Sequence, residues 1–155
     1  MKKRMIVIGV MLLLILAMST TVSAQVVRIP FTSVGTLVEI LDPGKWSYPG
    51  NNAHVRDMVE LIRTESADER ITGWHTLVAN GNWDANGYGP IWGTFVLDVD
   101  AYDGTWEGSY TGVIDENGLS LRMQAHGYGD LSDFRIEGTY LNGVTNGEII
   151  ELPTP

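Results

Sequence analysis

Tight glycine turns between alternating runs are the feature that most constrains this chain, and they lie within residues 92–143. Asp103-Gly104, Asn117-Gly118 and Asn142-Gly143 each separate stretches in which apolar and polar side chains alternate. A type I′ turn needs positive φ at both central residues, so these dipeptides between alternating runs indicate β-hairpins. This half of the chain is therefore expected to be an up-and-down antiparallel meander.

Further strands are expected on both sides of the meander. Residues 33–41, 54–64 and 71–79 precede it, and residues 147–152 follow it. Residues 58–63 also fit a helical turn, but β-branched content and neighbouring strands favour a strand. The pattern predicts an all-β fold, an eight-stranded antiparallel up-and-down β-barrel, because short hairpins suit a barrel better than a Greek-key sandwich.

The N-terminal segment has the pattern of an export signal. Lys2, Lys3 and Arg4 precede an apolar run over residues 5–17, and Val22-Ser23-Ala24 has the small residues of a cleavage site. We expect a signal peptide over 1–24 and a single domain over 25–155. The mature protein would then be secreted, extracellular or periplasmic, with no stable membrane span after cleavage. A retained signal anchor is the alternative.

The charge balance disfavours two classes of partner. The leader holds three basic and no acidic residues, which leaves 7 Lys and Arg against 19 acidic residues, a formal charge of −12. Such a surface repels nucleic acid and anionic lipid. The chain has no cysteine, so sheet packing must stabilise the exported domain without disulfides. A homo-oligomer is compatible with the sequence, and a small apolar molecule is the expected partner.

Glycine and aromatic spacing in the meander suggests a family. Gly104-Thr-Trp-Glu-Gly108, Tyr110-x-Gly112, His126-Gly-Tyr-Gly129 and Gly138 resemble the strands of the allene oxide cyclase and dirigent barrel superfamily. Residues 64–73 and 89–93 resemble uncharacterised secreted bacterial proteins near that superfamily. The resemblance implies an eight-stranded barrel with an apolar cavity. It also implies chemistry that steers the cyclisation or coupling of reactive small molecules without a metal, but it assigns no catalytic residue here.

Strand alternation selects candidate ligand contacts. Trp106 and Tyr110 share one strand face, and the corresponding faces of the next strands carry large apolar side chains. The cavity candidates are Trp92, Trp106, Tyr110, Met123, Phe134 and Tyr140. A filled core without a cavity is the alternative. Glu60 and Glu107 are strand carboxylates: an inward one would have a raised pKa and could act as a general acid, and an outward one would be solvated.

No metal or cofactor is expected. Asn82-x-Asp84-x-Asn86-Gly87 has the oxygen spacing of a calcium loop, but Gly93 stands where the bidentate Glu belongs. This loop and the acidic turn at residues 98–104 fit ordinary Asx turns equally well. The three histidines, at positions 54, 75 and 126, are too scattered for a zinc motif.

Three functions follow from these residues. The first is a non-enzymatic, secreted barrel that binds a small molecule. The second is a cyclase-like or isomerase-like enzyme that acts on a small apolar ligand held in the barrel. The third is a structural or interaction module with a solid core. A cavity would separate the third from the other two, and an ionisable group buried in that cavity would favour the enzyme.

Overall fold

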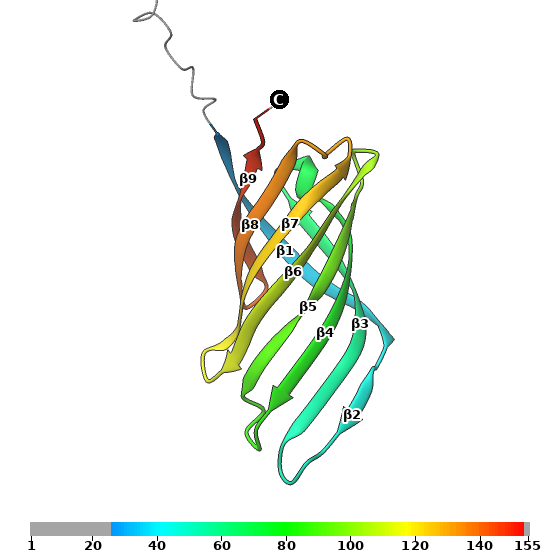
Figure 1. Ribbon diagram of the computed structural model, residues 1–155, viewed down its shortest axis with the longest axis vertical. Helices are drawn as coiled ribbons and strands as arrows, with labels where there is room; N and C mark the ends of the chain where they lie inside the picture. The colour runs from blue at the N-terminus through cyan, green and yellow to red at the C-terminus, as the bar shows by residue number, and fades with distance from the viewer. Residues whose placement is uncertain (1–25, 154–155) are drawn as a thin grey trace, which may run out of the picture.

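The computed structural model describes residues 26–153, and this part of the chain is an all-β, antiparallel barrel (Figure 1). Its elements are β1 Val27–Asp42, β2 Lys45–Ser47, β3 Ala53–Ser66, the 3-10 helix η1 Glu69–Ile71, β4 Gly73–Trp83, β5 Gly89–Val99, β6 Gly104–Asp115, β7 Gly118–Gly129, β8 Phe134–Leu141 and β9 Val144–Glu151. Among these residues no helix is long and apolar enough to cross a membrane.

β1 closes the sheet into a ring. Its first half, Val27–Val34, pairs with β9, and its second half, Ser33–Asp42, pairs with β3. β2 pairs only with β3, so the ring itself contains eight of the nine strands, in chain order. The predicted eight-stranded up-and-down barrel is therefore confirmed. Closure removes most of the exposed sheet edge that an open sheet would leave.

The predicted hairpins form, and one side chain links two of their turns. Asn142 and Gly143 have φ values of 47° and 100°, so only this turn has the positive φ at both residues that a type I′ turn requires; at Asn117-Gly118 only Gly118 has a positive φ, of 108°, and neither Asp103 nor Gly104 has one. The Asn142 side chain accepts a hydrogen bond from the Leu119 backbone N–H at 2.9 Å and donates one to the Asn117 carbonyl at 2.9 Å. The β6–β7 and β8–β9 turns are thus held together at one end of the barrel.

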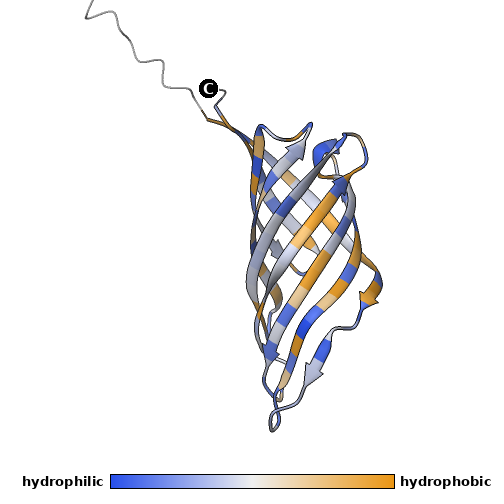
Figure 2. Ribbon diagram, turned by 45° about the vertical axis from the view of Figure 1, so that its right-hand side comes forward, coloured by the Kyte–Doolittle hydropathy of each residue, from blue (hydrophilic) through white to orange (hydrophobic). Residues whose placement is uncertain are grey.

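Alternation along the strands fills the barrel with apolar side chains. In Figure 2 hydrophobic and hydrophilic positions alternate along the strands. Trp106, Tyr110 and Ile149 are among the buried members of one continuous cluster, whereas Glu107 on the opposite face of β6 is exposed. Inward apolar and outward polar residues are the sorting expected of a barrel in water.

A bulge in β3 changes which of its residues face inward. The register jumps between Val55 and Met58, and Asp57 there has a φ of 56°. Unbroken alternation would place Val55 and Glu60 on opposite faces. The extra residue lets both point into the barrel, because a bulge inserts one residue and shifts the alternation beyond it.

Several boundaries differ from the sequence-based prediction. β1 begins at Val27 and not at residue 33, because its first half finds a partner in β9. β4 continues to Trp83 and β5 begins at Gly89, which shortens the gap between the predicted strand 71–79 and the predicted meander that starts at residue 92. β2, Lys45–Ser47, lies between the predicted strands 33–41 and 54–64, where no strand was predicted. The predicted signal peptide lies outside the described residues.

Candidate functional site

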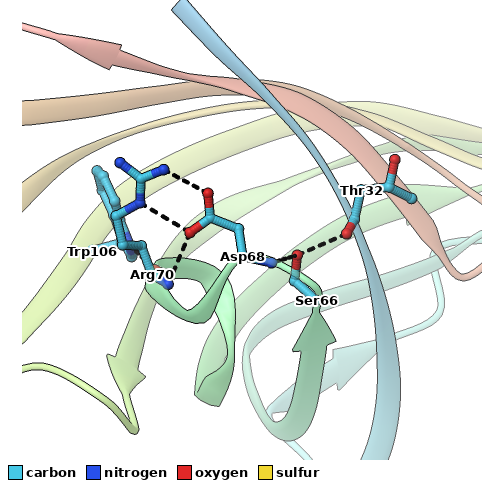
Figure 3. Close-up of polar contacts among 5 residues, drawn as sticks. All are labelled: Thr32, Ser66, Asp68, Arg70 and Trp106. Carbon is cyan, nitrogen blue, oxygen red and sulfur yellow. Dashed lines mark hydrogen bonds and ion pairs between the residues drawn. The ribbon is translucent and has the colours of Figure 1, made fainter.

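The short segment between β3 and β4 closes one end of the barrel (Figures 1 and 3). Asp68 caps η1 by accepting a hydrogen bond from the Arg70 backbone N–H at 3.1 Å, and its carboxylate also pairs with the Arg70 guanidinium at 2.6 Å. This ion pair lowers the pKa of Asp68. The Trp106 indole N–H donates to the Arg70 carbonyl at 2.6 Å, and Ile71 is buried beneath the segment. The buried side chains of Ile71 and Trp106 thus form an apolar plug at this end of the barrel.

A cavity of about 270 Å³ lies inside the barrel beneath this plug. Its wall is mainly apolar, with Ile71, Leu77 and Phe95 among the residues that line it. Exposure rises away from η1: Leu37, which also lines the cavity, is 54% exposed. The cavity is therefore accessible from the end opposite η1. Apolar cavities of roughly 150 Å³ already bind benzene, so this one has room for a larger molecule.

Few polar side chains interrupt the apolar wall. The polar residues that line the cavity are Ser33, Glu60, Thr64, His75, Tyr110, Tyr140 and Thr145. A small number of polar groups in an apolar pocket is typical of ligand sites, where they fix the orientation of the ligand. Among the described residues that line the cavity, Glu60 is the only Asp, Glu, Lys or Arg.

Gly93 allows the Tyr110 hydroxyl to reach across a neighbouring strand. Tyr110 on β6 lies opposite Gly93 on β5, and its hydroxyl donates a hydrogen bond to the Val78 carbonyl on β4 at 3.1 Å. A Cβ atom at position 93 would lie only 2.7 Å from this hydroxyl. Burial, and then the negative charge of Glu60, raise the pKa of Tyr110, so its phenol stays protonated.

Glu60 places a carboxyl group in the cavity without a partner. No hydrogen bond or ion pair joins its side chain to another described residue, and burial alone raises its pKa. Its strand neighbours are apolar: Ile40 lies opposite it on β1 and Leu77 on β4. Glu60 is half-buried, so its carboxylate loses part of its contact with water without gaining a partner in the protein, and a ligand could supply that partner.

His75 is a second polar group that lacks a partner. Its Nε2 atom is buried with no hydrogen bond, and its ring packs edge-on against Phe95 with the ring centroids 4.9 Å apart. Burial lowers the pKa of His75 to about 4. The imidazole is therefore neutral at ordinary pH, because burial in an apolar wall disfavours its charged form.

The structure brings together three of the predicted ligand contacts. Tyr110, Met123 and Tyr140 line the cavity. Trp106 belongs to the plug and Phe134 packs against the core, but neither is part of the cavity wall. Binding by these residues remains a prediction.

Trp92 was predicted to lie at the barrel interior, but it lies on the outer face of β5. Ile91 and Phe95 on the same strand are buried in the core, which puts Trp92 on the outer face by alternation. There its ring lies beneath the Arg56 guanidinium, 5.2 Å from the ring centroid. The prediction followed the alternation that carries Val96, and Val96 also points outward.

Of the two carboxylates considered in the sequence, Glu60 lies in the cavity wall and Glu107 is exposed on the outer face. The sequence did not single out His75, because a lone histidine carries no motif. Its inward position could be read from alternation with Leu77, since both fall on the face that starts at Ile71. Apart from the alternation of apolar and polar residues within β1, nothing in the sequence indicated that this strand lines the cavity.

The segment with the oxygen spacing of a calcium loop, residues 82–87, forms an Asx turn in the structure, which was the other interpretation that the sequence allowed. The Asp84 side chain accepts hydrogen bonds from the backbone N–H groups of Asn86 at 2.8 Å and Tyr88 at 3.0 Å. These bonds lower the pKa of Asp84. Within residues 26–153, no three His, Asp or Glu side chains gather closely enough to hold a metal ion.

Comparisons with protein-family models, curated proteins and solved structures gave no match to this chain.

Proposed function

We propose that this protein binds a small, mainly apolar molecule inside its β-barrel. The observation that carries the proposal is the cavity of about 270 Å³, with an apolar wall and a few polar groups. A buried apolar wall favours an apolar ligand because binding removes its surface from water, at roughly 25 cal/mol for each Å². The plug at η1 closes the far end, so a ligand enters from the side of Leu37.

A native mass spectrum of protein purified from its own host tests this proposal. A bound molecule should appear as added mass that is lost on activation in the gas phase. Leu77→Trp, which fills the cavity, should abolish the adduct, whereas Val96→Trp on the outer face should keep it. Circular dichroism spectra of both variants should match that of the wild-type protein, which checks that both fold. An adduct that survives Leu77→Trp, or a wild-type protein that never binds apolar molecules, would favour a structural or interaction module.

Glu60 favours a second candidate function, an isomerase-like or cyclase-like activity. Burial in the cavity raises the pKa of Glu60, which favours its carboxyl group as a proton donor and acceptor toward a bound molecule. Glu60 would take a proton from one position of the ligand and return it at another, so that no proton is gained or lost. Incubating the recovered ligand in D₂O distinguishes this activity from binding. Wild-type protein should introduce deuterium, and Glu60→Gln should not.

A further inference from the structure

The chemistry of the cavity also indicates which class of apolar molecule it accepts, an inference that rests on the proposed binding function. Glu60 provides the only formal charge among the described residues of the wall, and that charge is negative. Within residues 26–153, no Lys or Arg lines the cavity to neutralise this charge. The wall therefore holds one negatively charged carboxylate, that of Glu60, to which no described side chain of the protein binds.

The groups that pack around Glu60 cannot supply this partner. The Tyr110 hydroxyl already donates its hydrogen to the Val78 carbonyl. His75, on the neighbouring strand β4, is neutral because burial lowers its pKa to about 4. The side facing β1 presents the aliphatic residues Leu37 and Ile40. The residues of β1, β4 and β6 named here thus offer the carboxylate either an apolar group or a neutral polar one.

We propose that the cavity binds an apolar molecule that carries one protonated amine, and that the Glu60 carboxylate binds this amine. An ammonium group donates hydrogen bonds to the half-buried carboxylate and neutralises its charge, and such charge-assisted bonds are roughly twice as strong as neutral ones. A hydroxyl supplies only a neutral hydrogen bond, and a carboxylate is repelled. The excess of acidic residues over the whole chain also attracts cations to the protein.

The volume of the cavity further limits which amines can bind. A cavity of about 270 Å³ holds an amine larger than benzene, such as an arylalkylamine or a short aliphatic amine. His75 adds one neutral polar side chain to this wall. Most of the ligand must be apolar, because the remaining wall provides few polar contacts.

Three matched probes test the inference by calorimetry at neutral pH: 2-phenylethylamine, 2-phenylethanol and 3-phenylpropanoate. They share a phenyl ring and differ in the charge of the terminal group. Wild-type protein should bind the amine about tenfold more tightly than the alcohol, and the carboxylate most weakly. Glu60→Gln should lower amine affinity to that of the alcohol and leave alcohol affinity nearly unchanged.

Two controls keep the outcome interpretable. Glu107→Gln removes an exposed carboxylate from the outer face and should leave all three affinities unchanged. In wild-type protein, acidification that protonates Glu60 should remove the preference for the amine, which gives a test independent of any variant. Equal affinity for amine and alcohol, or an amine preference that survives in Glu60→Gln, would overturn this inference and leave the binding function standing. Failure of all three probes, together with a native mass spectrum free of ligand, would overturn the binding function itself.

Discussion

His75 is the residue through which mild acid should weaken the fold. Its pKa falls from 6.5 to about 4 on folding because the imidazole is buried. The unfolded chain therefore binds more protons between these values, and stability is complete above about pH 6.5 and lost as the pH falls toward 4. One unit of pKa corresponds to about 1.4 kcal/mol, so the total loss is on the order of 3 kcal/mol.

Urea unfolding of wild-type protein and His75→Phe between pH 7.5 and pH 4 measures this effect. Glu60 acts in the opposite direction: its pKa is raised, so its contribution is present below its unfolded pKa and is lost as the pH rises through its folded pKa. The difference between the two proteins isolates His75. It should grow steadily in favour of the variant as the pH falls. If the unfolding free energies of the two proteins change in parallel with pH, His75 is protonated as easily in the folded protein as in the unfolded chain.

Trp106 and Glu107 are adjacent residues for which opposite effects are expected. Trp106 is fully buried and donates a hydrogen bond to the plug, whereas Glu107 is exposed. Trp106→Ala should cost about 3–5 kcal/mol of unfolding free energy, because it leaves a large void and an unpaired carbonyl. Glu107→Ala should cost less than about 0.5 kcal/mol. Denaturant midpoints for the two variants measure these losses. A larger loss of unfolding free energy for Glu107→Ala would mean that Glu107, and not Trp106, faces the barrel interior.

At the scale of single elements, the β3 bulge decides which functional residues reach the cavity. Asp57 has a φ of 56°, and its backbone N–H donates to the Asn80 side chain at 3.2 Å. This left-handed conformation costs L-residues roughly 1–2 kcal/mol, with Asp and Asn tolerated better than most. The bulge lets Val55 before it and Glu60 after it both face inward.

Substitutions at Asp57 test the bulge. Asp57→Gly should raise the unfolding free energy by about 0.5–1 kcal/mol, since glycine adopts positive φ freely. Asp57→Val should lower it by about 1–2 kcal/mol, because a β-branched residue is strained at this φ. Asp98→Val, at an exposed position of β5, is the matched control and should change it by less than about 0.5 kcal/mol. Equal losses for the two valine variants would show that the bulge carries no strain.

Local rules predicted most elements, and longer-range contacts account for the rest. Turns such as Asn117-Gly118 were readable because tight hairpins restrict residue type, and the faces of β6 to β8 followed from strict alternation. The start of β1 was not readable, because its partner β9 lies more than a hundred residues away. The inward position of Glu60 depends on a bulge held by Asn80, a contact from another strand. Trp92 looked like a core residue by type, yet its ring is covered from outside by Arg56.

At the scale of the whole molecule, β9 is the strand that completes the ring. It pairs along its length with β8 on one side and with the first half of β1 on the other. Removing it would expose the edges of both neighbours and open the wall of the cavity, where Thr145 belongs to the lining. Open edges with apolar faces associate with other strands, so a chain without β9 should form larger assemblies through these edges.

A chain that ends at Leu141 tests this dependence against a chain that ends at Leu152. The longer chain keeps β9 and the hydrogen bond from the Leu152 N–H to the Asp133 carbonyl at 2.8 Å. It should unfold in urea as one cooperative transition, because the closed ring folds and unfolds as a unit. The shorter chain should lose the cooperative transition and elute in size-exclusion chromatography as concentration-dependent assemblies. If the shorter chain keeps both a sharp transition and a concentration-independent size, the strands β3 to β8 form a stable sheet alone, and closure by β1 and β9 serves the cavity and not the fold.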